Sequence, residues 1–191
     1  MRTGSIKRTT RETSITVTVK LDGSGAAEIE TPIGFLNHML RSLSFHSMIN
    51  IQIKASGDLK HHISEDIALC LGIAIREALG KGKPVNRFGF ATVPMDCSLS
   101  SCALDLGGRP YSVVSLELKG NIIEDMAVED ITHFFNSLST SLAANIHINI
   151  LYGSNDHHKA ESAFKALALS LRQAVSLDTR RKGTPSDKGV I

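Results

Sequence analysis

An internal repeat constrains this chain more than any other feature, because similar residues return in the same order after 95 or 96 positions. His38 recurs as His133, and the pattern His-His-x-x-Glu at residues 61–65 recurs at residues 157–161. A repeat of this length indicates that one structural unit occurs twice. The shift of 96 continues through the pairs Leu71/Leu167, Ile75/Leu171 and Arg76/Arg172.

Hydrophobic periodicity predicts the elements of the first unit. Residues 14–21 alternate apolar and polar side chains, which is typical of a half-buried strand. Asp22-Gly23-Ser24-Gly25 is a turn sequence, so we expect residues 26–30 to return as the next strand of a hairpin. A helix, a strand and a second helix are predicted to follow, at residues 33–46, 49–53 and 61–79.

The second unit repeats this order after a predicted linker at residues 80–84. Strands are predicted at residues 88–95, 101–106, 111–118 and 146–151, and helices at residues 128–144 and 157–175. We therefore expect an α+β fold of two half-domains, each a mainly antiparallel sheet covered on one face by two helices. The helices of the two halves should pack together, since each sheet must cover its apolar face. The expected boundaries are residues 1–83 and 84–177 for the halves, and 178–191 for a tail that either frays or is ordered by a ligand.

The two His-His-x-x-Glu motifs predict metal binding. Residues i and i+4 share one face of a helix, so His61 and Glu65 can hold one ion together. His62 is rotated by about 100° and points toward a second ion. The second motif repeats this arrangement with His157, His158 and Glu161, and His38 and His133 offer one further ligand per ion. Imidazole with carboxylate suits manganese, iron or zinc.

Alternative roles remain open for single residues. An isolated histidine is more often a hydrogen-bonded structural residue than a ligand, and His46 and His147, which lack repeat partners, are structural residues or substrate contacts. Arg87, Arg109 and the tail have residue types that bind anions. The alternative is that each is an ordinary solvated surface residue. A general acid/base role is open to Glu12.

Composition excludes several classes of protein. The net charge of +2 is too small, and its basic residues too scattered, to favour nucleic acid. No apolar run approaches the ~18 residues of a membrane span, and the polar start of the chain carries no secretory signal. Three cysteines without metal-type spacing indicate reduced thiols. We expect a cytoplasmic protein that binds neither nucleic acid nor membrane.

Motifs along nearly the whole chain resemble those of the imidazoleglycerol-phosphate dehydratase family in its stand-alone form. The matching segments are residues 8–13 (RTTRET), 34–40 (GFLNHML), 57–59 (GDL), 94–96 (PMD), 108–110 (GRP), 133–135 (HFF), 155–158 (NDHH) and 185–190 (PSDKGV). The resemblance implies a lyase of histidine biosynthesis that dehydrates D-erythro-imidazoleglycerol phosphate to imidazole acetol phosphate. It also implies two manganese ions per active site, and a homo-oligomer of 24 subunits with active sites at subunit interfaces.

The resemblance also implies roles for individual residues. One ion would take His38, His62, His157 and Glu161, and the other His61, Glu65, His133 and His158. The substrate phosphate would be held by Arg87, Arg109, Lys165, Ser186 and Lys188. Glu12 would be the acid/base carboxylate and His46 a substrate contact, so that Glu12, His61, Glu65, His157 and Glu161 form the catalytic set.

The sequence departs from the family pattern at a few positions. The stretch before His61 is shortened to Leu59-Lys60 and lacks the usual two aspartates, and Cys97 stands where a glutamate normally follows Met-Asp. Gly107, Pro32 and Asn37 replace a serine, a glycine and a frequent aspartate. Two rival functions are a metal-binding or shell-forming protein without turnover, and another metal-dependent lyase or hydrolase on the same scaffold.

Overall fold

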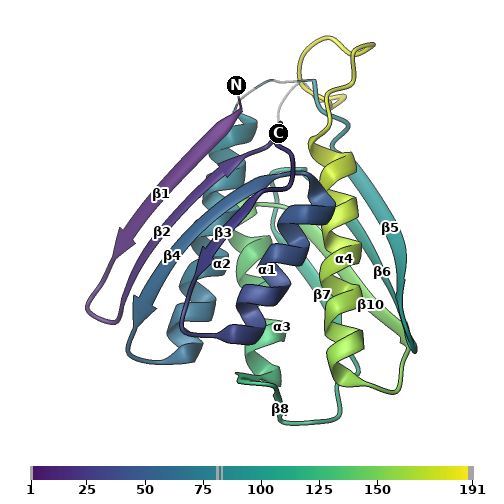
Figure 1. Ribbon diagram of the computed structural model, residues 1–191. Helices are drawn as coiled ribbons and strands as arrows, with labels where there is room; N and C mark the ends of the chain where they lie inside the picture. Colours follow the sequence, from purple (N-terminus) through teal and green to yellow (C-terminus); the bar gives the residue numbers. More distant parts are fainter. Residues whose placement is uncertain (1, 81, 83, 189–191) are drawn as a thin grey trace.

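The computed structural model describes residues 2–80, 82 and 84–188. Two four-stranded sheets form the outer layers, and four long helices lie between them (Figure 1). The predicted linker at residues 80–84 includes Lys81 and Lys83, which lie outside the described residues, as do the last three residues of the tail.

The first half has the strand order β1-β2-β4-β3. Its elements are β1 (Thr3–Thr9), β2 (Thr13–Lys20), β3 (Ala27–Glu30), α1 (Gly34–Ser47), β4 (Asn50–Gly57) and α2 (Lys60–Leu79).

The second half repeats this topology with the order β5-β6-β10-β7. Its elements are β5 (Phe88–Met95), β6 (Ser98–Asp105), β7 (Tyr111–Ser115), the short hairpin β8 (Ile122–Ile123) and β9 (Met126–Ala127), α3 (Val128–Leu142), β10 (Asn145–Tyr152) and α4 (Asp156–Val175). The predicted α+β fold is confirmed.

Some of the predicted local structure was wrong. Residues 26–30 do not return as the second strand of a hairpin, because β3 pairs in parallel with β4. Strand β1 was not predicted, since its outward side chains are polar and it buries little beyond Gly4. Strand β7 ends at Ser115 rather than at residue 118.

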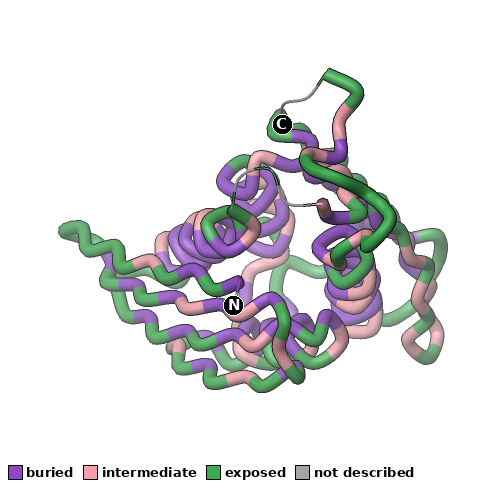
Figure 2. Tube along the Cα trace, turned by 90° about the horizontal axis from the view of Figure 1, so that it is seen from above, coloured by how far each residue is buried: buried purple, intermediate pink, exposed green. Residues whose placement is uncertain are grey.

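Alternation on the strands produces the layered core. Ile15, Val17 and Val19 on β2 are completely buried, whereas Ser14 and Thr16, which alternate with them, face outward. Helix α2 covers β1 and β2, and α4 covers β5 and β6. The helices pack across the halves, α1 against α4 and α2 against α3, so that buried segments gather between the sheets (Figure 2).

Two glycines allow each first strand to lie close to its covering helix. A Cβ atom on Gly4 would lie 2.0 Å from the carbonyl oxygen of Ala74 in α2. A Cβ atom on Gly89 in β5 would lie 1.9 Å from the carbonyl oxygen of Ser170 in α4. These matching contacts show that strand residues of the two halves correspond with a shift of 85, while the helix residues keep their shift of 96.

Candidate metal centre

The first cluster of candidate ligands joins α1 to α4. His38 on α1 and His157 on α4 each place Nε2 3.5 Å from Oε2 of Glu161. The ligand atoms all lie within 4.8 Å of one another, close enough for one ion. His157 and Glu161 are four residues apart on α4, so the helix itself sets their spacing.

The second cluster joins α2 to α3 in the same way. His61 and Glu65 lie one turn apart on α2, and His133 on α3 completes a group whose ligand atoms lie within 4.8 Å of one another. The His61 and His133 rings are 5.0 Å apart between centroids. His133 Nδ1 is buried and has no hydrogen-bond partner within the described part of the chain.

The donor sets of both clusters fit a divalent transition metal. Each offers two imidazole nitrogens and one carboxylate, a combination that suits manganese, iron or zinc. The predicted sets have four ligands, and the structure brings three of each four together. Among the described residues, His62 and His158 belong to neither cluster.

Two carboxylates outside the clusters form hydrogen bonds with ligand histidines, at the ring nitrogens that point away from the clusters. Asp130 Oδ1 lies 2.5 Å from His61 Nδ1, and Glu124 Oε1 lies 3.2 Å from His157 Nδ1. A carboxylate that accepts from Nδ1 leaves Nε2 free for a metal and makes it more basic. Neither acid was predicted from the sequence. Asp130 could have been predicted from the sequence, because it lies one helical turn before the candidate ligand His133.

Glu161 is ionised despite its burial. Burial alone would raise its pKa, but hydrogen bonding and charge from Lys165, with His38 adding to them, lower the pKa below its usual value. Lys165 Nζ lies 2.8 Å from Glu161 Oε1. The first cluster therefore already contains the charged form that a metal requires.

The remaining motif histidines face the hairpin turns at the ends of the sheets. His62 Nδ1 lies 2.9 Å from Asp58 Oδ1, and this hydrogen bond raises the pKa of His62. Glu12, in the β1–β2 turn, has Oε2 3.9 Å from the same nitrogen and an exposed side chain. Cys97, in the β5–β6 turn, has its sulfur 3.5 Å from His158 Nδ1.

The structure brings only some of the predicted phosphate-binding residues close to one another. Arg87 forms a two-pronged ion pair with Asp105, which raises the pKa of Arg87, and it also donates to the carbonyl oxygen of Pro185 in the tail. This bond brings the tail residues next to Arg87. Ser186 Oγ accepts from the Lys188 backbone N–H at 3.3 Å.

Two other predicted contacts lie at different places. Arg109 follows β6 and has an exposed side chain. His46 on α1 lies near the first cluster, where burial and then the charge of Lys165 lower its pKa.

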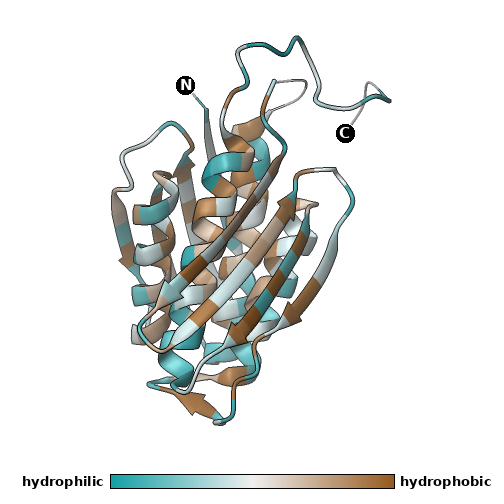
Figure 3. Ribbon diagram, turned by 90° about the vertical axis from the view of Figure 1, so that its right-hand side faces the viewer, coloured by the Kyte–Doolittle hydropathy of each residue, from teal (hydrophilic) through white to brown (hydrophobic). Residues whose placement is uncertain are grey.

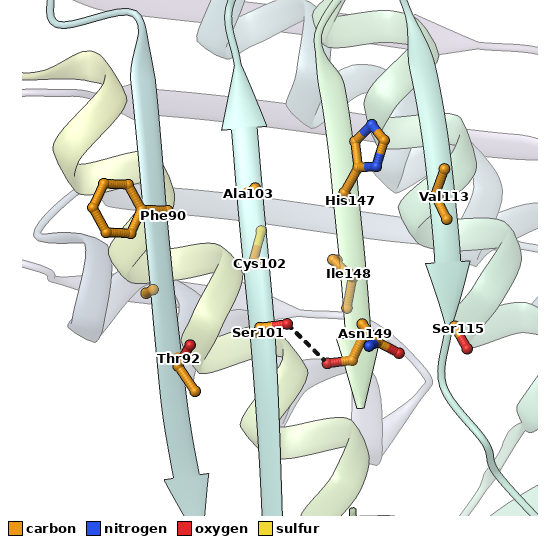
Figure 4. A pocket seen from close by; sticks show the side chains of 11 residues that line it. Phe90, Thr92, Ser101, Cys102, Ala103, Val113, Ser115, His147, Ile148 and Asn149 are labelled. Carbon is orange, nitrogen blue, oxygen red and sulfur yellow. Dashed lines mark hydrogen bonds between the residues drawn. The ribbon is translucent and has the colours of Figure 1, made fainter. Parts of the chain in front are cut away.

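His147 lies apart from both clusters. It lines a shallow hollow of about 410 Å³ on the outer face of the second sheet, together with Phe90 and Val113 (Figure 4). This position does not support a substrate contact within the same chain.

The duplicated sheets and the paired histidine–glutamate clusters define the chain as an α+β protein with two candidate sites for divalent metal. The sequence profile described as "Imidazoleglycerol-phosphate dehydratase" matches residues 31–171. The chain belongs to the imidazoleglycerol-phosphate dehydratase family. The family resemblance of the motifs is thereby confirmed.

Relatives and solved structures agree with this assignment. Proteins named imidazoleglycerol-phosphate dehydratase from Dehalococcoides mccartyi and Clostridium kluyveri are 49% and 45% identical, each covering 100% of this chain, with 97% and 100% of their own lengths matched. The Staphylococcus aureus dehydratase structure has a TM-score of 0.85 at 31% identity, covering 92% of this chain and 99% of its own. The Pyrococcus furiosus structure, in complex with (S)-C348, has a TM-score of 0.85 at 39% identity, covering 97% and 100%.

Proposed function

We propose that this chain is a metal-dependent hydro-lyase that converts D-erythro-imidazoleglycerol phosphate to imidazole acetol phosphate and water in histidine biosynthesis. Family membership over the full chain supports the reaction. The observation that carries the proposal is the pair of clusters, because the motif that repeats in the sequence supplies two matching ligand groups in space.

Two manganese ions per active site would be held by four ligands each. His38, His157 and Glu161 would hold one ion with His62, and His61, Glu65 and His133 the other with His158. We propose that His62 and His158 come from a second copy of the chain, since they lie outside the clusters of their own chain. When bound, the ions would act as Lewis acids and hold the imidazole ring of the substrate.

The chain's own residues would manage the protons. Loss of water breaks one C–O and one C–H bond and leaves an enol, which tautomerises to the ketone. Glu12 is proposed as the carboxylate that carries the proton, since its side chain is 59% exposed and lies beside a candidate metal ligand. His46 is proposed to contact the substrate beside Lys165.

The substrate phosphate would be held by basic groups and the tail. Arg87, Lys165 and the tail residues offer charge and hydrogen-bond donors of the kind that bind phosphate. Arg87 is already fixed by Asp105, which orients its guanidinium toward the tail. The proposed set is Arg87, Arg109, Lys165, Ser186 and Lys188.

The proposed assembly is a homo-oligomer of 24 subunits in the cytoplasm. Figure 3 shows the outer face of the second sheet. This face exposes four large apolar side chains, Phe88, Phe90, Tyr111 and Val113, and an exposed apolar patch of this kind is typical of an interaction surface. We propose that other copies cover it. None of the helices in the described part of the chain is long and apolar enough to cross a membrane.

The test is an assay of imidazoleglycerol phosphate dehydration before and after chelator stripping, and again after manganese is restored. Turnover that is lost with the metal and returns with it supports the proposal. Two bound ions without turnover would favour a metal-binding protein that lacks activity. Faster conversion of another imidazole or sugar phosphate would favour a different metal-dependent lyase.

A further inference from the structure

Contacts at two glycines align the turns at the ends of the two sheets. A Cβ atom on Gly57 would lie 3.0 Å from the Thr13 side chain, and a Cβ atom on Gly153 would lie 2.4 Å from Ser98 Oγ. Gly57 and Gly153 correspond with the helix shift of 96, and Thr13 and Ser98 with the strand shift of 85. The two hairpin turns therefore occupy the same place in each half.

This alignment places Cys97 where the first half has Glu12. Both residues lie immediately before the aligned residues, and both approach the second histidine of their own motif. Glu12 Oε2 lies 3.9 Å from His62 Nδ1, and Cys97 Sγ lies 3.5 Å from His158 Nδ1. The thiol is the closer of the two, at a normal distance for a hydrogen bond to sulfur.

Among the described residues, no carboxylate contacts Nδ1 of His158 in the way that Asp58 contacts Nδ1 of His62. Asp58 holds His62 Nδ1 from four residues earlier, and the corresponding residue before His158 is Ser154. Ser154 hydrogen-bonds to Cys97, which lowers the pKa of the thiol. Three of the four motif histidines therefore have a carboxylate on Nδ1, and His158 has the sulfur of Cys97 instead.

We propose that Cys97 is the positioning residue of His158, holding its Nδ1 so that Nε2 can face the metal ion. The inference rests on the proposed role of His158 as a ligand. Nε2 lies 3.5 Å from Oδ2 of Asp96, whose side chain is 67% exposed, so a metal can displace this contact. A group that orients a ligating histidine changes metal affinity roughly 10- to 100-fold.

The experiment measures bound ions per chain in chelator-stripped protein dialysed against buffered concentrations of free Mn²⁺. We expect Cys97→Ala to weaken one of the two binding steps by roughly 10- to 100-fold and to leave the other unchanged. Adding Ser154→Asp to Cys97→Ala should restore the weakened step, because it places a carboxylate where Asp58 serves His62. Cys97→Ser, which keeps an acceptor, should lose less.

The matched control is Asp58→Ala, which should weaken the opposite step. Melting temperature and light scattering of each variant report fold and assembly. Two unchanged steps in Cys97→Ala, or equal weakening of both, would overturn the inference while leaving the metal site intact. A wild-type protein that binds no Mn²⁺ would overturn the proposed site itself, and the inference with it.

Discussion

The two clusters contain the same types of ligand, but they differ in which of their ligands are supported by neighbouring side chains. In the first, Lys165 and His38 keep the buried Glu161 ionised, while His157 is supported by Glu124, whose side chain is 63% exposed. In the second, Asp130, only 6% exposed, supports His61.

The difference shows how a duplicated site diverges. The ligands keep their positions because the helix spacing is repeated, but each supporting group comes from a different part of the fold. Leu69 stands one turn after Glu65, where the second half has Lys165. We therefore expect metal binding at the first cluster to depend more on the carboxylate Glu161, and metal binding at the second cluster to depend more on the histidine His61.

The largest effects should come from the carboxylates themselves. Glu161→Ala and Glu65→Ala should each remove one ion per chain and reduce turnover by at least about 1000-fold, because a catalytic metal contributes several kcal/mol to the transition state. Metal analysis and a turnover assay measure both effects. A variant that keeps two ions would show that its glutamate is not a ligand.

Removing the supporting carboxylates should affect metal binding at the two clusters to different extents. Asp130→Asn should weaken one Mn²⁺ binding step by roughly 10- to 100-fold, because the buried Asp130 orients His61. Glu124→Gln should change the other step by less than about threefold, because water screens an exposed pair. Dialysis against buffered Mn²⁺ measures both, and equal effects would remove the asymmetry.

The glycine contacts should respond alike in the two halves. Gly4→Ala and Gly89→Ala each place a methyl group about 2 Å from a helix carbonyl oxygen, and each should lower the free energy of unfolding by about 1–3 kcal/mol. Urea unfolding followed by circular dichroism measures the change. A neutral result at one position would show that its strand can move away from its helix.

The smallest effect concerns the ion pair of Arg2 with Asp22. Arg2 corresponds to Arg87 with the strand shift of 85, but Asp22 does not correspond to Asp105, the partner of Arg87. The hydrogen bond from Arg2 holds the pKa of Asp22 below its usual value, so the ionised carboxylate stabilises the fold above about pH 4. Asp22→Asn should therefore cost less than about 1 kcal/mol at pH 7, since the carboxylate is 49% exposed.

The pH dependence of that cost tests its origin. The difference between Asp22→Asn and wild type should shrink below about pH 4 and vanish once the pH passes the lowered pKa of the folded state. Denaturant unfolding at pH 7 and pH 3 measures it. A difference that does not change with pH would mean that the carboxylate charge does not stabilise the fold.

Much of the fold and of the site could be predicted from the sequence because both depend on local spacing. Strand alternation and helix periodicity identified the main elements, and a turn of helix fixed the pairs His61/Glu65 and His157/Glu161. Strand β1 and the pairing of β3 were missed, since β1 is polar and the direction of pairing depends on distant residues. The motifs also indicated the family.

Only the tertiary structure decided which helices meet and which groups support the ligands. Residue spacing left open whether His38 would join the motif of its own half or that of the other. The family resemblance implied that it joins His157 and Glu161, and the packing of α1 against α4 brings these three residues together. The contacts of Asp130 with His61 and of Cys97 with His158 were likewise hidden, because each joins residues more than 60 positions apart. Helix periodicity acts over a few residues, whereas these contacts arise only when two sheets bury their apolar faces against a shared layer of helices.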